Sequence, residues 1–339
     1  MFYKAKKNLI VKSIRKRNKD NKFDYEKAES YKITIDDDPL INNSYYFSSH
    51  SEDLSIFFRL GLRSNVDETW FYIRYKGETY SLKEEFFSFE TSPLIIKRVD
   101  DNWDIYFSGT LNFNDDVEFK AVFTPTYKPL NFSTDMPEER MATGIANEKW
   151  NKEFFKELDN IKVQTHYEQS GRLKGAFTLH KEKIEFDLPC LRDHSFGKRD
   201  WKYMNNHLWI MALNDSEEFN YSLVSYPVMS LLEVGYFKDS TKKDSYLLSA
   251  NYDLGEISKS IVPAEFKMKI KLTDGRLIDV CAKVIDTIPY RFSNGAYTLY
   301  ESIADYLIDG VKFKGIFEIG FNKDKSRIFN SRNLDELKR

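Results

Sequence analysis

The chain has few of the residues from which metal sites and disulfides are built. Its 339 residues include two cysteines, Cys190 and Cys281, which lie far apart. They provide neither the ligand spacing of a zinc site nor a disulfide framework. The five histidines include no HExxH pair, so no metal is predicted. Such cysteine usage is typical of a reduced, intracellular setting, and we predict a cytoplasmic protein.

Long apolar runs and nucleotide-binding loops are also missing. No run approaches the ~18 residues of a membrane-spanning helix, and no secretory signal is visible. There is no Walker A loop, no GxGxxG before a helix and no GxSxG elbow, and no βαβ alternation indicates a doubly wound fold. The net charge of −2 gives no overall basic character, so no nucleic-acid partner is predicted.

The N-terminal segment differs from the rest in composition. Its basic residues, all before the first acid at Asp20, are Lys4, Lys6, Lys7, Lys12, Arg15, Lys16, Arg17 and Lys19. The apolar residues Leu9, Ile10, Val11 and Ile14 are interleaved with them. A basic amphipathic segment of this kind predicts either peripheral contact with an anionic membrane or a solvated, partly frayed tail.

Alternating apolar residues favour an all-β fold. Aromatic residues make up 16% of the chain, and such residues fit half-buried strands. Short period-two runs occur, for example, at residues 54–62, 117–123 and 266–272, with turn-forming residues between them. Asp274-Gly275 and Asp309-Gly310 are hairpin signals. The pattern predicts antiparallel strands in a sandwich or barrel.

The alternation stops between residues 124 and 161. Three prolines, Pro125, Pro129 and Pro137, indicate an irregular connection. The spacing of Trp150, Phe154, Leu158 and Ile161 then predicts one amphipathic helix near residues 147–159. We therefore predict a basic extension at 1–30, a β domain at 31–188 that includes the helix, a second β domain at 189–321 and a polar tail at 322–339.

The densest group of ionisable side chains is the sequence RDHSFGKRDW, which begins at Arg192. His194 is a candidate general acid or base because its ordinary pKa lies near neutrality. Asp193 or Asp200 could orient it or supply a proton. Arg192 and Arg199 could hold these carboxylates or bind an anionic group. The same residues could equally form a buried ion-pair network at a strand corner.

Weaker candidates lie elsewhere. Glu168 and Arg172 are predicted to form a structural pair across a turn. Glu301 and Glu318 lie in the last predicted hairpin, where each is either a functional group that faces the barrel interior or a side chain that points outward into water, and we expect the second for each. The segment that begins at Tyr45 carries alternating hydroxyls, which fit either a site or an ordinary aromatic strand.

These segments together resemble the lipocalin-like carotenoid 1,2-hydratase and AttH-type superfamily. The central segment is similar to the RDHSWGxRDW signature of an uncharacterised branch, with Phe196 where tryptophan is usual. The run 167–175, the aromatic strand at Tyr45 and the closing hairpin with Glu301 and Glu318 resemble the family in order. The resemblance covers residues from about 35 to 321 and implies two lipocalin-like antiparallel barrel halves packed together.

The resemblance also implies an activity. It points to a cofactor-independent hydratase or cyclase that uses acid–base chemistry on an apolar isoprenoid, terpenoid or polyene, with His194 and Asp193 in the site. Desolvation would keep Asp193 neutral as a proton donor, and Asp200 is a further catalytic candidate. The residues expected to line an aromatic pocket are Tyr45, Phe47, Trp70, Phe196, Trp201, Trp209 and Tyr221. The alternatives are a non-catalytic carrier of a lipophilic small molecule and an interaction protein with a filled core, and no obligate protein partner is predicted.

Overall fold

The computed structural model describes residues 2–20, 23–34, 37–64, 66–87, 92–161, 164–241, 243–253 and 255–324. Most of the predicted polar tail lies outside these residues. The chain forms two compact units. The open-sheet unit comprises Asp24–Ser133 and Val163–Arg199, and the barrel unit comprises Met1–Phe23, Thr134–Lys162 and Asp200–Arg339. The units therefore change at residue 199/200 rather than at the predicted 188/189, because the central segment continues a long strand.

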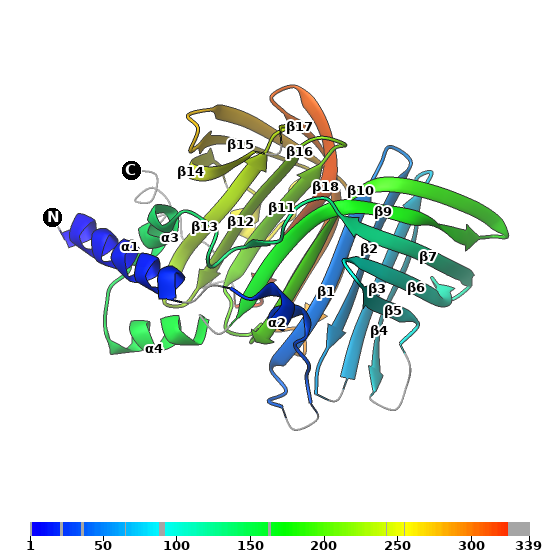
Figure 1. Ribbon diagram of the computed structural model, residues 1–339, viewed down its shortest axis with the longest axis horizontal. Coiled ribbons are helices and arrows are strands. Elements are labelled where there is room, and N and C mark those ends of the chain that lie inside the picture. Colours follow the sequence, from blue (N-terminus) through cyan, green and yellow to red (C-terminus); the bar gives the residue numbers. More distant parts are fainter. Residues whose placement is uncertain are drawn as a thin grey trace. The chain divides into compact units, whose positions relative to one another are not determined.

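The barrel unit is a closed antiparallel barrel of eight strands (Figure 1). The strands are β11 (Asn206–Leu213), β12 (Glu218–Tyr226), β13 (Met229–Lys238), β14 (Asp244–Tyr252), β15 (Glu265–Leu272), β16 (Leu277–Phe292), β17 (Tyr297–Ile308) and β18 (Val311–Asn322), with a short 3₁₀ helix, η1, at Ile257–Lys259. Alternate side chains such as Ile210, Phe266 and Phe317 point inward and form a continuous buried core. Side chains therefore fill the barrel interior.

Both predicted hairpins of the barrel are confirmed. Asp309 and Gly310 join β17 to β18 with φ angles of 47° and 83°. A two-residue turn with both φ angles positive matches the right-handed twist of the flanking strands, which explains the Asp-Gly sequence. Gly275, with a φ of 91°, lies in the turn that joins β15 to β16.

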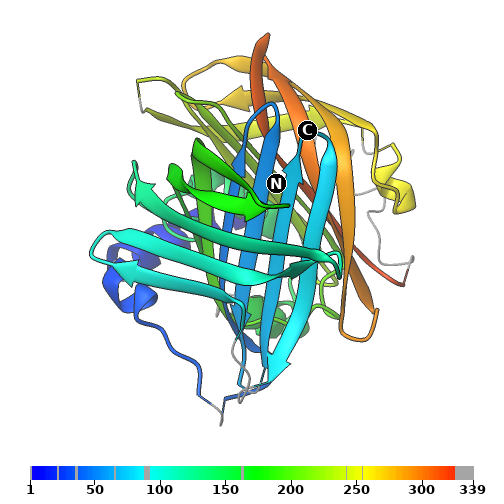
Figure 2. The same ribbon diagram turned by 90° about the vertical axis from the view of Figure 1, so that its right-hand side faces the viewer.

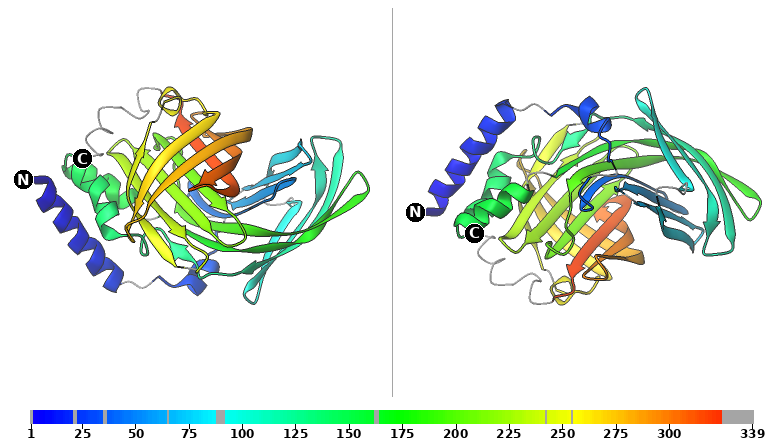
Figure 3. Two further views of the ribbon diagram at one scale, coloured as in Figure 1. Left: turned by 90° about the horizontal axis from the view of Figure 1, so that it is seen from above. Right: turned by 90° about the horizontal axis from the view of Figure 1, so that it is seen from below.

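Three helices accompany the barrel: α1 (Phe2–Asp20), α3 (Glu138–Asn147) and α4 (Lys152–Ile161). The single helix predicted near 147–159 corresponds to α4, whose start is displaced because the side chain of Asn151 accepts a hydrogen bond from the Phe154 amide at 2.7 Å. Helix α3 was not predicted. The blue helix α1 lies beside the green helix α3 in both views of Figure 3, with Ile10, Val11 and Ile14 buried.

The open-sheet unit is a curled antiparallel sheet of ten strands (Figure 2). Its path runs β4 (Glu78–Phe87), β3 (Val66–Tyr75), β2 (Leu54–Leu62), β1 (Ile41–His50), β10 (Glu182–Lys198), β9 (Thr165–Leu179), β7 (Asp115–Pro125), β6 (Asn102–Leu111) and β5 (Leu94–Val99), and β8 (Leu130–Asn131) pairs with β9. Helix α2 (Tyr25–Glu29) begins after Asp24, whose side chain caps it. The all-β prediction is confirmed, with one half a closed barrel and the other an open sheet.

No helix in the described ranges is long and apolar enough to cross a membrane.

Candidate active site

The central segment occupies the end of β10, and its side chains alternate between the two faces of the sheet. Arg192 and His194 lie on the same face as Cys190, which belongs to the buried core. Asp193 lies on the opposite face, directly across from Glu168 of β9. The expected partnership of Asp193 with His194 is therefore not formed, because neighbouring residues of a strand point in opposite directions. Two separate clusters result.

His194 lies at the centre of the first cluster and is fully buried. Its Nε2 lies 2.7 Å from Asn43 Oδ1, so Nε2 carries the proton and donates it. Its Nδ1 then accepts the hydroxyl proton of Tyr167. The ring also stacks on Tyr45, with 4.2 Å between centroids. Burial lowers the pKa of His194, in keeping with a neutral imidazole whose two nitrogens both have partners.

Arg192 and Glu29 form the charged half of the same cluster. The Arg192 guanidinium is 1% exposed, donates to the Glu29 carboxylate of α2 and lies 4.4 Å from the ring centroid of Trp103. Glu29 also approaches His194, with 3.4 Å between Oε2 and Nδ1. Burial alone would raise the pKa of Glu29, but the charge and the hydrogen bonds of the Arg192 guanidinium help to lower it to about 2. Glu29 is thus an ionised carboxylate, and sequence analysis placed it in the basic extension.

Aromatic contacts complete the attachment of this N-terminal segment to the sheet. Tyr31 stacks on Phe196, with centroids 4.5 Å apart, and Tyr25 meets Tyr167 edge-on at 5.5 Å. Phe196 therefore contacts a tyrosine that follows α2. Together with the buried ion pair of Arg192 and Glu29, these contacts favour the ion-pair alternative for Arg192 and His194: the network holds α2 against β9 and β10.

The second cluster lies on the opposite face and contains a histidine that sequence analysis did not select. His166 Nε2 lies 2.6 Å from Asp193 Oδ2 and 3.5 Å from Glu168 Oε1. The side chain of His166 is 36% exposed, whereas those of Asp193 and Glu168 are 11% and 0% exposed. The ring of Phe132 stacks on His166 at 4.5 Å. An imidazole with one open side and two carboxylates behind it can exchange protons with a bound molecule.

Charge determines the protonation state of this cluster. Burial by itself would lower the pKa of His166, but the carboxylates of Asp193 and Glu168 raise it to about 10. Burial would raise the pKa of Asp193, but His166 and then Arg199 bring it below its ordinary value. Near neutral pH, His166 is therefore an imidazolium and Asp193 a carboxylate. The expectation of a neutral Asp193 as proton donor is wrong on this geometry, since the cation beside it keeps it ionised.

The protonation of His166 predicts how stability depends on pH. Its pKa in the folded protein lies above that of an unfolded histidine, so the stabilisation is complete below about pH 6.5. It is then lost as pH rises toward 10. We expect urea midpoints of the native chain to fall between these pH values, and those of His166→Gln to fall less. If the urea midpoints of the native chain and of His166→Gln change with pH in parallel, His166 is not the group whose pKa is raised.

A charged strip continues this face across β1, β2, β3 and β4. Arg59 is buried, donates to Glu68 and places its Nε 2.9 Å from the Ser44 hydroxyl. Lys83 lies 3.6 Å from the same Glu68 carboxylate. Trp70, expected in a substrate pocket, lies under the Arg59 guanidinium at 4.8 Å. Its role in the structure is a cation–π contact within this strip.

The remaining candidates of the open-sheet unit have structural contacts. Phe47 is a fully buried core residue. Arg172 pairs with Asp187 at 2.7 Å, so the predicted pair with Glu168 is wrong. Four residues along a strand separate two side chains by roughly 13 Å, which is too far for an ion pair. The backbone amide of Arg199 donates to the Leu40 carbonyl at 2.8 Å, where the unit ends.

Other candidates lie in the barrel unit. Asp200 accepts a hydrogen bond from the Lys202 amide at 2.9 Å in a turn. Trp201 stacks on Phe292 with centroids 4.4 Å apart, and Trp209 is buried on the outer face of β11. Tyr221 is in the barrel core and donates to Glu233 at 2.6 Å. None of these four side chains belongs to the clusters on β10.

The two acids of the last hairpin do face out of the barrel, but not into water. Glu301 is 1% exposed. Glu318 lies 2.7 Å from His207 Nε2, and His207 Nδ1 lies 2.6 Å from the Tyr297 hydroxyl. The expectation of solvated side chains is wrong because the part of this outer face that carries Glu301 is buried and the part that carries Glu318 is mostly buried. The pattern of alternation gives the direction of a side chain but not what covers it.

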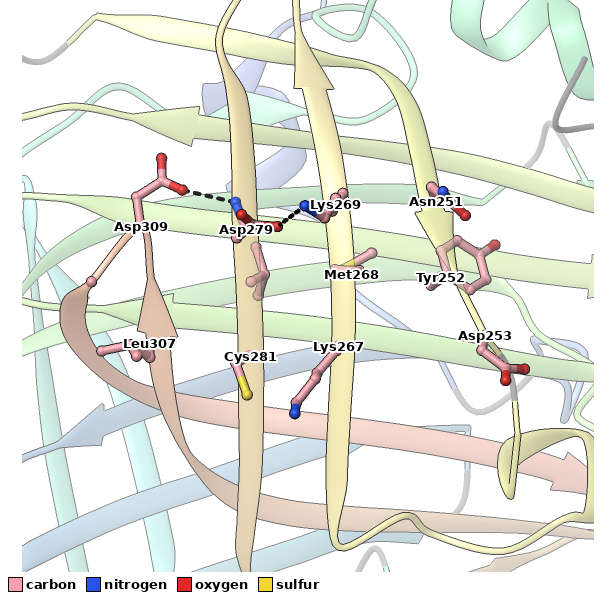
Figure 4. A pocket seen from close by; sticks show the side chains of 12 residues that line it. Asn251, Tyr252, Asp253, Lys267, Met268, Lys269, Asp279, Cys281, Leu307 and Asp309 are labelled. Carbon is pink, nitrogen blue, oxygen red and sulfur yellow. Dashed lines mark hydrogen bonds and ion pairs between the residues drawn. The ribbon is translucent and has the colours of Figure 1, made fainter.

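A shallow depression on the outer face of β14–β17 has a volume of about 700 Å³ (Figure 4). Lys269 and Asp279 form an ion pair of 3.1 Å across its floor, and Cys281 and Lys267 lie on neighbouring strands. The depression is open and its ionisable groups are mostly exposed, so it lacks the shielded acid and base of the His166 cluster. In the described part of the chain, no group of three or more metal-binding side chains is found.

The model of a domain of unknown function, DUF7064, matches residues 28–323. The chain belongs to the DUF7064 family. The comparison with curated proteins finds no significant match.

Solved structures share the fold. A candidate AttH of Nitrosomonas europaea has a TM-score of 0.57 at 11% identity, covering 83% of this chain and 92% of that one. Kievitone hydratase of Nectria haematococca has a TM-score of 0.55 at 10% identity, with 84% and 90% covered. CghA bound to Sch210972 has a TM-score of 0.51 at 8% identity, with 83% and 88% covered. This DUF7064 chain therefore has the lipocalin-like AttH-type fold that its sequence resembles.

Proposed function

We propose that this DUF7064 protein is a cofactor-independent hydratase- or cyclase-type enzyme for an apolar substrate, with His166 and Asp193 as its acid–base pair. The observation that carries the proposal is the 2.6 Å approach of a partly exposed imidazolium to a nearly buried carboxylate. Structural relatives named as a hydratase and as CghA have the same fold, which supports the proposal by analogy.

The chemistry follows from the two protonation states. In a hydration, Asp193 takes a proton from water, the water oxygen bonds to one alkene carbon, and the π electrons accept a proton from His166 on the other. Asp193 then releases its proton to water, and His166 regains a proton from water at its partly exposed side, so both groups return to their starting states. In a cyclisation, the same His166 proton starts ring closure and Asp193 removes one at the end. The buried Glu168 keeps the imidazolium charged between turnovers.

The surroundings support an apolar substrate. Phe132 covers one side of the His166 ring. Tyr46, Phe57 and Tyr72 lie on the same face of the sheet as Asp193, and Phe57 stacks on Tyr72 at 4.4 Å. Aromatic groups lower the local dielectric, which strengthens each charge interaction in the cluster. An isoprenoid, terpenoid or polyene remains our proposed substrate class.

An isotope experiment tests the proposal without a known substrate. The purified chain is incubated with an organic extract of host cells in H₂¹⁸O, and products are followed by mass spectrometry. Hydration should add one water that carries the heavy oxygen, and cyclisation should change retention without changing mass. A compound that co-purifies and stays chemically unchanged would favour a non-catalytic carrier. If the His166→Gln variant still forms the product at the native rate, this cluster has no part in the mechanism.

A further inference from the structure

The N-terminal helix α1 has two faces of different chemistry within the barrel unit. Ile10, Val11 and Ile14 are buried, and the helix packs beside α3 (Figures 1 and 3). Two basic residues of α1 form polar contacts with α3 and the residue that follows it. Arg15 lies 2.6 Å from Glu139 of α3, and Lys6 donates to the Glu148 carbonyl at 2.6 Å. The basic segment is therefore an ordered helix attached to the unit, and its other face remains exposed.

The exposed face combines apolar and cationic side chains in a fixed order. Residues at helical spacing on it are Phe2, Ala5, Leu9, Lys12, Lys16 and Lys19, all exposed. Phe2 and Leu9 are 86% and 59% exposed, which is unusual for large apolar residues on a helix that already has a buried face. Among the described residues, no carboxylate forms an ion pair with the three lysines. The stripe is apolar in its first half and cationic in its second.

We infer that this face of α1 binds the surface of an anionic lipid membrane while the helix stays packed on α3. Anionic headgroups complement Lys12, Lys16 and Lys19, and the interface accepts Phe2 and Leu9 below the headgroups. A nucleic acid would complement the lysines only and would leave the two apolar side chains in water. The inference does not depend on the proposed reaction.

Vesicle sedimentation of the full chain tests this surface. The probes are vesicles of phosphatidylcholine alone and of phosphatidylcholine with roughly a third phosphatidylserine. We expect binding to the anionic vesicles only, weakened by added salt because the Debye length shortens. Each lysine near the surface contributes roughly fivefold, so loss of the three positive charges alone weakens binding on the order of 100-fold. The triple variant Lys12→Glu, Lys16→Glu, Lys19→Glu also adds repulsive charges, so its binding should fall by more than that. Phe2→Ser with Leu9→Ser should weaken binding but keep its salt dependence.

A matched control changes charge elsewhere on the same unit. The triple variant Lys267→Glu, Lys271→Glu, Lys312→Glu alters three exposed lysines by the same charge and should bind like the native chain. Equal binding of the native chain to both vesicle types, or an equal loss in both triple variants, would overturn the inference. The inference would also be overturned if the chain bound a labelled single-stranded RNA as tightly as the anionic vesicles and if the Phe2→Ser, Leu9→Ser variant bound that RNA equally well.

Discussion

Replacement of Glu29 with glutamine is expected to destabilise the open-sheet unit by about 3–5 kcal/mol. The change leaves the Arg192 guanidinium charged, 1% exposed and without its carboxylate. A buried charge without a partner costs more than an ion pair contributes, so the effect should exceed that of a surface pair. Hydrogen exchange of the β1 and β10 amides measures it locally, which is necessary because two compact units need not unfold together.

The chain provides a matched control on the same helix. Glu26 pairs with Arg98 at 2.8 Å, but its side chain is 77% exposed, so Glu26→Gln should leave exchange almost unchanged.

Lowering the pH provides a second test of the Glu29–Arg192 ion pair. The pKa of Glu29 in the folded protein, about 2, is below its ordinary value of 4.5. The ionised Glu29 therefore stabilises the folded unit above pH 4.5, and this contribution is lost as pH falls toward 2. Near pH 2 the native chain and Glu29→Gln should show the same hydrogen-exchange protection. Equal protection of both variants at neutral pH would contradict the network.

Asp193→Asn is expected to lower turnover of the substrate found by isotope labelling by about 10²- to 10⁴-fold. The amide cannot accept a proton from water, and it removes the charge that holds His166 as an imidazolium. The pH–rate profile should therefore shift as well, because His166 should lose its proton at lower pH. Asp193→Glu, which restores a carboxylate, should recover part of the rate. Far-UV circular dichroism and hydrogen exchange show whether each variant is folded.

Asp187 offers the corresponding control on the same strand. It pairs with Arg172 at 2.7 Å, and both side chains are more than 40% exposed, at 46% and 43%. Asp187→Asn removes the same charge from β10 and should keep native turnover and pH dependence. If Asp193→Asn, shown to be folded, turns over at the rate of Asp187→Asn, then Asp193 is not the base. A loss of folding in Asp193→Asn alone would leave His166→Gln as the decisive variant.

Particular residues show how far prediction from sequence reached. The strands followed from period-two alternation, and the hairpin at Asp309-Gly310 followed from the need for two positive φ angles. His166 was overlooked because it lies in an ordinary strand, two residues before Glu168 and just outside the run 167–175 that resembles the family. Glu29 was overlooked because it follows a basic helix and is 163 residues from Arg192. Contacts over such separations depend on strand pairing, which no local pattern contains.

The amino-acid sequence by itself determined that the chain is all-β and that it has the AttH-type fold, and it located the densest segment of ionisable residues. Alternation, turn chemistry and composition are properties of short segments, so they can be read from the sequence without knowing which segments contact one another. Only the tertiary structure decided which side chains of that segment work together. The pleat of β10 turns His194 toward the buried core and Asp193 toward His166, and pairing with β9 supplies the partners on each face. Because neighbouring residues of a strand face opposite sides of the sheet, His194 belongs to a structural network and Asp193 belongs to the candidate acid–base site.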